Sequence, residues 1–198
     1  MSETEKRMAG DYEIINSVHI GEKEVVLGVN KKLNDGKYYC GYCDSNELLD
    51  LYVDGVSSNN YPKIVELFAV RVGDAARDII RVMEKEKEFV GDDRELTTND
   101  CEPISYEDNL NKKIIVIKGD VLRPEYQRAS HQLLYVTGGN GAYPNARGRK
   151  IFATSLLDGK DSVFYRQDVL GIVDKDKLPK WAKDGYENII KPKDRGER

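Results

Sequence analysis

The stretch PKIVELFAVRVGDAARDIIRVMEKEKEF, residues 62–89, carries the clearest structural signal in this chain of 198 residues. Pro62 suits the first turn of a helix, where a backbone N–H has no partner to lose. On one face, apolar side chains recur at helical spacing: Ile64, Phe68, Val72, Ala75, Ala76, Ile79 and Met83. The stretch therefore predicts one long amphipathic helix.

Strand signals precede this helix. Residues 11–20 and 24–30 are strand-like and are joined by a short link that contains Gly21. The turn signal Asn34-Asp35-Gly36 leads into a third strand over residues 37–42. These three strands predict a small antiparallel meander at the N-terminal end.

Two connecting segments complete the first half. Asp44 with Glu47 three positions on is an N-terminal capping pattern, and it predicts a short helix over residues 48–53. After the long helix, the acidic and polar residues 91–110 are predicted to be a linker. The first domain would then span residues 11–90.

The periodicity changes after residue 111. Four runs are predicted to be strands, at residues 113–118, 131–137, 150–157 and 163–173. Asp158-Gly159-Lys160 is a tight hairpin signal, and a last helix is predicted from Pro179 to about Ile190. The second domain, residues 111–191, would be a curved antiparallel sheet or small barrel, which makes the whole chain α+β. We expect six of its apolar side chains to be buried: Val116, Leu134, Ile151, Phe152, Val163 and Val169.

The composition is that of a globular protein, with 39% hydrophobic and 33% charged residues. The longest apolar runs, such as residues 114–117, are far shorter than the roughly 20 residues of a membrane-spanning helix. No leader-like segment opens the sequence. We therefore expect a cytoplasmic protein without a membrane partner, and the long helix could provide the seam of a homodimer.

Charge is distributed unevenly along the chain. Residues 1–100 carry 13 Lys/Arg and 21 Asp/Glu, a net charge of −8, whereas residues 101–198 carry 18 and 14, a net charge of +4. The stretch 112–150 has eight basic residues against Asp120 and Glu125. Such polarity favours a charged partner and does not bear on the fold.

Cys40-Gly-Tyr-Cys43 is a motif with metal-ligand spacing. A structural zinc site needs four ligands, and Cys101, His19 and His131 lack the partner spacing to complete one. A thioredoxin-like redox pair would require a surrounding βαβ pattern, which the sequence lacks. We interpret the two cysteines as strand residues, one of them facing the core, and we expect neither a metal nor a cofactor.

The segment TGGNGAYPNARGRK, residues 137–150, combines four glycines with three basic residues. It lacks the Gly-Lys-Ser/Thr of a P-loop, and it does not lead into a helix as a dinucleotide fingerprint would. One interpretation is a backbone-amide concavity or flexible clamp that brings Arg147, Arg149 and Lys150 to phosphates. The alternative is a long connection whose arginines are merely solvated.

The preceding segment LRPEYQRASHQ, residues 122–132, interleaves basic, aromatic and acidic side chains. Arginine planes and tyrosine rings can stack on the bases of single-stranded RNA. The two segments together supply the predicted nucleic-acid-binding residues: Arg123, Tyr126, Arg128, Tyr143, Arg147, Arg149 and Lys150. The alternative is that Arg123 and Arg128 form scaffold ion pairs with Glu125 and Asp120.

Catalysis would need a proton acceptor and a cation beside the scissile phosphate. A metal-independent ribonuclease could use His131 or Glu125 as the general base, with Arg128 or Arg147 stabilising the phosphorane. No Ser/His/Asp pattern and no paired-carboxylate spacing accompanies these residues. A non-enzymatic protein is therefore the preferred hypothesis.

Several strings resemble those of a family of mobile-element accessory proteins, found in conjugative elements, plasmids and prophages of Gram-positive bacteria. They are YEIINSVHIGEKEVVLG, CGYCDSNELLDLY, LRPEYQ, SHQLLYVTGGNGAYPNARGRKIFA, DVLGIV and LPKWAK, and they span most of the chain from Tyr12 to Lys183. In that family, similar stretches occur alone or attached to larger DNA-processing proteins. Small proteins from such elements often counter host defences, and some anti-CRISPR proteins come from this setting.

The resemblance implies a protein that counters host defence by binding a CRISPR or restriction nucleoprotein effector or its guide RNA. Two alternatives stay open. One is a ribonuclease-like factor that cleaves guide RNA or promotes its loss, and the other is a non-catalytic interaction module for conjugation or plasmid maintenance.

Overall fold

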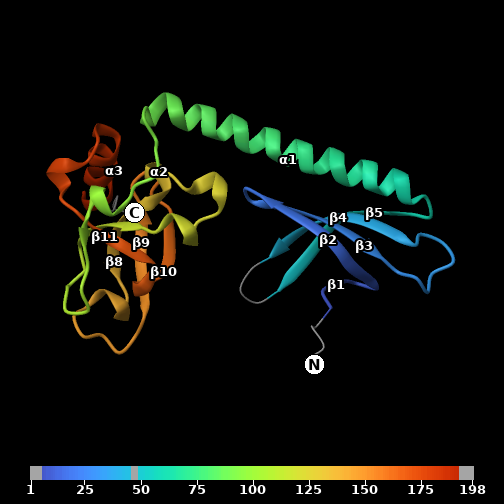
Figure 1. Cartoon of the computed structure of the whole chain (residues 1–198), viewed down its shortest axis with the longest axis horizontal. Coiled ribbons are helices and arrows are strands. Elements are labelled where there is room, and N and C mark those ends of the chain that lie inside the picture. Colours follow the sequence, from blue (N-terminus) through green and yellow to red (C-terminus); the bar gives the residue numbers. More distant parts are fainter. Residues whose placement is uncertain (1–5, 46–48, 192–198) are drawn as a thin grey trace, which may run out of the picture. The chain divides into compact units, whose positions relative to one another are not determined.

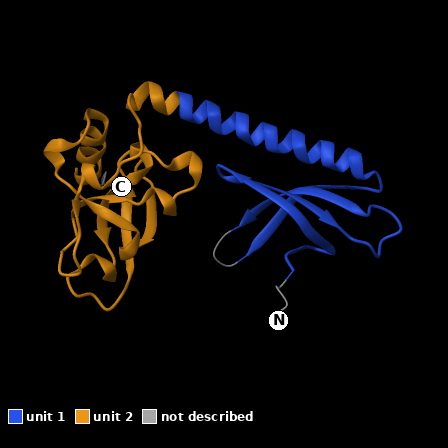
Figure 2. Ribbon diagram, viewed as in Figure 1, with its two compact units in different colours: residues 1–84 blue, residues 85–198 orange. Residues whose placement is uncertain are grey.

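The computed structural model describes residues 6–45 and 49–191. The fold is α+β: antiparallel strands come first, a long helix follows, and an antiparallel sheet with a terminal helix completes the chain (Figure 1). The chain divides into two compact units, unit 1 over residues 1–84 and unit 2 over residues 85–198 (Figure 2). The predicted fold class is confirmed.

Unit 1 is a five-stranded antiparallel sheet packed against a helix. The strands follow one another in both sequence and space: β1 (Met8–Ala9), β2 (Tyr12–Ile20), β3 (Lys23–Val29), β4 (Tyr38–Ser45) and β5 (Asp50–Ser58). The helix α1 (Tyr61–Val90) begins one residue before Pro62, as the sequence predicts, and its last residues belong to unit 2. The predicted meander and long helix are therefore both present.

The core of unit 1 lies between the sheet and α1. Val25, Leu27, Cys40 and Ile64 are buried there, and partly buried hydrophobic residues of the predicted helix face pack against them, among them Phe68 and Val72. Burying each aliphatic side chain stabilises the fold by about 1.5–3 kcal/mol.

The predicted short helix over residues 48–53 is wrong, since β5 begins at Asp50 and residues 46–48 lie outside the described part of the chain. β5 pairs with β4 from Ser45 opposite Asp50 to Tyr38 opposite Ser58. Tertiary pairing overrides the helical spacing of the apolar residues, because the backbone N–H and C=O groups of β4 are available to pair with this segment. Tyr52 and Val53 are also residue types that favour strands.

A partly buried ion pair holds the first strands together on the sheet face away from α1. Arg7 donates to both carboxylate oxygens of Glu24 (2.6 and 2.7 Å), and also to Cys43 Sγ (3.1 Å) and Asp50 (3.2 Å). The hydrogen bonds from Arg7 lower the pKa of the Glu24 carboxyl against the opposing effect of its burial.

The two cysteines of the Cys40-Gly-Tyr-Cys43 motif point to opposite faces of β4. Cys40 is fully buried toward α1, whereas Cys43 accepts from Arg7 on the other face. Three residues apart on a strand, two side chains cannot converge on one ion. Within residues 6–45 and 49–191, no group of three or more His, Cys, Asp or Glu side chains could hold a metal ion.

Unit 2 is built on a curved antiparallel sheet whose strand order is β10-β9-β8-β7-β11-β6. The strands are β6 (Glu102–Pro103), β7 (Ile114–Ile117), β8 (Leu133–Gly138), β9 (Lys150–Ser155), β10 (Asp161–Tyr165) and β11 (Val169–Val173). A short helix, α2 (Ala129–Gln132), precedes β8, and α3 (Lys180–Ile190) ends the described chain where the last helix is predicted. The hairpin predicted at Asp158-Gly159-Lys160 joins β9 to β10.

The central strand β7 is buried on both of its faces. Ile114 and Val116 pack toward Trp181 of α3, whereas Ile115 and Ile117 pack into a second cluster with Leu134 and Ile151. An uninterrupted apolar run is what a strand covered on both sides requires.

Two of the predicted strands have different limits. The run 163–173 is divided between β10 and β11 by a 3-10 turn at Arg166–Asp168, where Asp168 accepts from the backbone N–H of Tyr165 (2.8 Å). The run 131–137 starts only at Leu133, because Asp93 accepts from the N–H and hydroxyl of Ser130 and holds the preceding residues in the helical turn α2.

Four of the six expected core residues are buried: Val116, Leu134, Ile151 and Val169. Phe152 and Val163 are not, with 48% and 51% of their surface exposed. The expectation failed because Ile151 and Phe152 are neighbours on one strand, so only one of them can face the core. Phe152 and Val163 lie opposite each other on β9 and β10, and both point outward.

The segment 91–110 is built into unit 2. The Arg94 carbonyl accepts from Ala129 N–H (2.8 Å), Leu96 N–H donates to the buried Gln132 side chain (2.7 Å), and Leu110 is fully buried. No helix in the described part of the chain is long and apolar enough to cross a bilayer.

Two helical glycines should respond in opposite ways to alanine. A Cβ at Gly185 of α3 would collide with the Leu156 carbonyl, whereas a Cβ at Gly73 of α1 would meet only the mobile end of Arg77, 3.4 Å away. We expect Gly185→Ala to destabilise the protein by about 1–3 kcal/mol through overpacking. Gly73→Ala should stabilise it by up to about 1 kcal/mol through helix propensity. Urea unfolding of both variants measures this, and two shifts of the same sign would contradict the packing described for α3.

Candidate nucleic-acid interface

The guanidinium of Arg166 fixes two irregular segments of unit 2. Its Nη1 donates to the Gly141 carbonyl (2.8 Å), and its Nη2 donates to the carbonyls of Ser105 and Asp108 (both 2.8 Å). Longer contacts of 3.4 Å reach the carbonyls of Tyr106 and Tyr143. Arg166 thereby ties residues 105–108 and 141–143 to the end of β10.

Two of the four glycines in the segment 137–150, Gly139 and Gly141, are required by close backbone packing. Gly139 has a φ of 96°, and a Cβ on it would lie 2.5 Å from the Lys150 carbonyl oxygen. A Cβ on Gly141 would collide with the Arg149 carbonyl. Leu110 N–H also donates to the Ala142 carbonyl (2.7 Å). The glycines therefore let this loop pack directly on β9, which differs from the flexible clamp considered from the sequence.

An open groove of about 770 Å³ lies beside this loop. Four of its lining residues are basic, and none is acidic: Lys118, Arg147, Arg149 and Arg166 stand beside Ile104, Ser105, Tyr106, Ala146, Gly148, Gln167 and Val169. We call this surface the basic groove. Its composition favours an anion over any other ligand.

The basic residues of the groove are of two kinds. Arg166 and Lys118 are held by backbone carbonyls, the latter through a 2.6 Å hydrogen bond from its ammonium to Gln167. Arg147 and Arg149 are exposed, and their guanidinium groups have no hydrogen-bond or ion-pair partner among the residues described. Two arginines with free donor groups are therefore available to phosphate oxygens.

The strand pair β9–β10 presents a second surface next to the groove. Lys150 lies opposite Tyr165, and Phe152 lies opposite Val163. These four side chains point away from the core that contains Ile151, and we call them the β9–β10 outer face. Because Arg166 N–H donates to the Arg149 carbonyl (2.8 Å), the outer face and the basic groove meet at the end of this strand pair.

Tyr143 and Tyr106 add aromatic surface near the loop. Tyr143 is 48% exposed and Tyr106 is 58% exposed, and the Tyr106 hydroxyl donates to the Ala146 carbonyl (2.8 Å). Asp108, in the same turn as Tyr106, accepts from Ser105 N–H (2.6 Å), and the hydrogen bonds from Ser105 lower the pKa of its carboxyl. Its charge is thus satisfied within the turn.

The second predicted group of binding residues, around Arg128, is organised differently. Arg128 is buried and pairs with the carboxylates of Glu86 and Asp93, the latter at 3.1 Å. Its Nη1 also donates to the Glu125 carbonyl (2.6 Å). Arg128 is therefore a scaffold residue, although its carboxylate partners are not the Glu125 and Asp120 side chains weighed from the sequence.

Two of the residues considered for ribonuclease chemistry, His131 and Arg128, contact each other and Glu86. The His131 ring lies 4.7 Å from the Tyr126 ring, and its Nε2 faces Glu86 and Arg128 at 3.3 and 3.2 Å. With two carboxylates and a carbonyl already bound, Arg128 has few donor groups left for a phosphorane. Arg123, at the start of this segment, is exposed.

Sequence reasoning identified Arg147, Arg149, Lys150 and Tyr143 but missed other residues of these surfaces. Lys118 and Arg166 lie far away in the sequence, and no local pattern connects them to the loop. Strand alternation places Phe152 on the same face as Lys150 and Tyr165 on the same face as Val163, but it does not tell which face of the strand is covered.

Comparison with known proteins finds no matching family model, no matching curated protein and no matching solved structure.

The role of Arg166 can be tested by substitution. Arg166→Ala leaves several carbonyls without a charged donor, so we expect the free energy of unfolding to fall by about 2 kcal/mol or more. Arg166→Lys should rescue little, since one ammonium cannot span segments that the guanidinium bridges. Arg147→Ala is the matched control and should change stability by less than about 0.5 kcal/mol. Equal unfolding curves for Arg166→Ala and Arg147→Ala would refute the structural role.

Proposed function

We propose that unit 2 binds single-stranded nucleic acid through the basic groove and the β9–β10 outer face. The observation that carries this proposal is a pair of exposed arginines, Arg147 and Arg149, in a groove without a lining carboxylate. Neither guanidinium has a partner within the described part of the chain. Phosphate contacts supply most of the sequence-independent affinity for nucleic acids, and arginine is suited to them because it can donate two parallel hydrogen bonds.

The neighbouring outer face favours a single strand over a duplex. Phe152 and Tyr165 are about half exposed, at 48% and 46%, and Lys150 lies directly opposite Tyr165. Unpaired bases can stack on such rings, whereas a duplex hides its base faces. The groove itself is lined by turns and strand ends, with no helix that could enter a major groove.

For the biological target, the support is the sequence resemblance to mobile-element proteins. We propose that this surface engages the guide RNA or DNA of a CRISPR or restriction effector and so counters host defence. The geometry offers the ribonuclease hypothesis no comparable support, because Arg128 is occupied by Glu86 and Asp93. The interaction module for conjugation remains the alternative if effectors are unaffected.

The charge contribution can be measured by titrating labelled single-stranded RNA at several salt concentrations. In the groove triple variant, Arg147 and Arg149 of the groove and the adjacent Lys150 of the outer face are all replaced by alanine. This variant should bind more weakly, and the slope of log affinity against log salt should fall by about 2, given about 0.7 per phosphate contact. Thermal stability should hardly change, because these side chains are exposed. The triple variant Lys175→Ala, Lys177→Ala and Lys180→Ala removes equal charge from exposed positions of unit 2 outside the groove and is the control.

The same titration separates stacking from charge. Phe152→Ala should weaken binding by about 1 kcal/mol or more at every salt concentration and leave the slope unchanged, since stacking releases no counterions. If the groove triple variant binds RNA as the lysine control does, the nucleic-acid proposal fails and a protein partner should be sought.

Guide RNA length after co-expression with an effector complex tests the biological target. We expect lost cleavage of target DNA with an intact guide RNA, because occupation of the complex breaks no phosphodiester bond. The groove triple variant should restore cleavage. Shortened guide RNA would instead favour the ribonuclease, and unchanged cleavage would favour the interaction module.

A further inference from the structure

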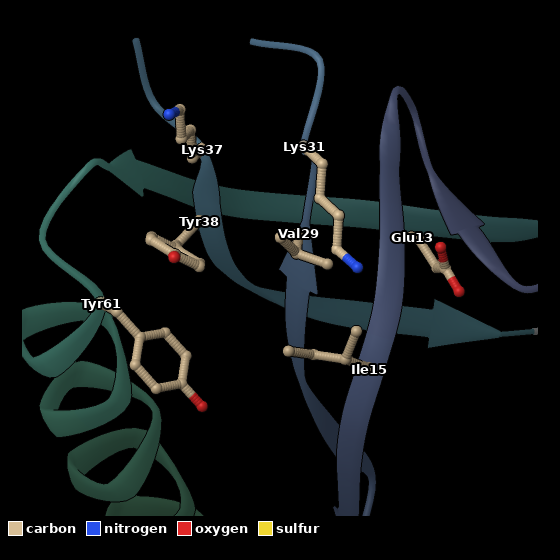
Figure 3. Close-up of a pocket in the computed structure, with 7 residues that line it drawn as sticks. All are labelled: Glu13, Ile15, Val29, Lys31, Lys37, Tyr38 and Tyr61. Carbon is tan, nitrogen blue, oxygen red and sulfur yellow. The ribbon is translucent and has the colours of Figure 1, made fainter. Parts of the chain in front are cut away.

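Unit 1 contains a separate cavity of about 530 Å³, within the range of roughly 300–1,000 Å³ typical of small-molecule sites. It lies on the sheet face that α1 covers, beside the first residue of that helix. Figure 3 shows the side chains that line it: Glu13, Ile15, Val29, Lys31, Lys37, Tyr38 and Tyr61.

The floor of the cavity is apolar and aromatic. Tyr38 of β4 and Tyr61 of α1 lie with their ring centroids 4.9 Å apart and tilted by 53°, and Ile15 and Val29 extend the surface across two further strands (Figure 3). Ile15 is the extra residue of a β-bulge between Ile14 and Asn16, which leaves it 49% exposed. Tyr61 is 43% exposed. A planar aromatic ligand would find stacking surface here.

The rim of the cavity carries uncompensated positive charge. Lys31 and Lys37 both belong to the connection between β3 and β4, and their ammonium groups have no hydrogen-bond or ion-pair partner within the described ranges. The one lining carboxylate, Glu13, is bound by Lys6 at 2.9 Å. An anionic ligand would therefore meet two available lysines and a carboxylate that already has a counter-charge.

Hydrogen bonds hold the lysine-bearing connection in place before any ligand arrives. Asn30 N–H donates to the Lys37 carbonyl (2.8 Å), and Lys37 N–H donates to Asn59 Oδ1 (3.1 Å). The Asn59 amide also donates to Asp35 (2.8 Å). A rim that is already ordered loses less entropy when a ligand binds.

We propose that this cavity binds a nucleoside monophosphate, with the base against Tyr38 and Tyr61 and the phosphate at Lys31 and Lys37. A phosphomonoester carries between about 1.5 and 2 negative charges at pH 7, which matches two ammonium groups better than a single carboxylate would. This site lies in unit 1, so it does not rest on the function proposed for unit 2.

Calorimetric titration of the full chain with AMP, adenosine and inorganic phosphate tests the site. AMP should bind at least about tenfold more tightly than adenosine or phosphate, because only AMP satisfies both halves of the cavity. The double variant Lys31→Ala, Lys37→Ala should lose at least about tenfold in AMP affinity. Tyr61→Leu should weaken AMP and adenosine binding alike.

Two controls locate the binding. Lys32→Ala removes one charge from the same connection at an exposed position outside the lining, and it should bind AMP like the unmodified protein. The triple alanine variant of Arg147, Arg149 and Lys150 should also keep its AMP affinity. Absence of AMP binding at millimolar concentration, or unchanged affinity in the Lys31/Lys37 double variant with its fold intact by circular dichroism, would overturn the proposal.

Discussion

The interaction on which unit 2 most depends is the set of hydrogen bonds from one guanidinium, that of Arg166, to backbone carbonyls of two irregular segments. The carbonyl oxygens accept hydrogen bonds from the guanidinium, and because they carry no formal charge they do not neutralise it. Since arginine stays protonated at any physiological pH, the residue that orders the loop also keeps the neighbouring groove positive. Structure and electrostatics thus have a common origin in one side chain.

Arg128 shows the opposite outcome for the same residue type. Its charge is paired with the carboxylates of Glu86, near the end of α1, and Asp93, both far from it in sequence, so it stabilises the scaffold and is not available to a ligand at the surface. A local sequence window cannot separate these two arginines. What distinguishes them is whether the tertiary partners are carboxylates or carbonyls.

The same distinction between local patterns and tertiary partners separates the features that the sequence predicts from those that it does not. The long helix and the strand pair around Asp158-Gly159-Lys160 were predictable, because periodicity and turn chemistry are local. The strand β5 was not predictable, because its extended conformation depends on pairing with the edge of β4. The outward orientation of Phe152 was not predictable either, because an apolar run does not show which of its alternate residues face the core. Of the candidate site, the loop residues Arg147 and Arg149 were found, whereas Lys118 and Arg166 reach the groove only through the topology of the sheet.

The placement of Cys40 and Cys43 on opposite faces of β4 has a consequence for the chemistry of unit 1. A bond between their sulfur atoms would require β4 to leave the ladders it forms with β3 and β5. The thiols are also buried, and burial raises the pKa of both, which keeps them in the less reactive protonated form. Oxidising and reducing surroundings should therefore leave the sheet unchanged.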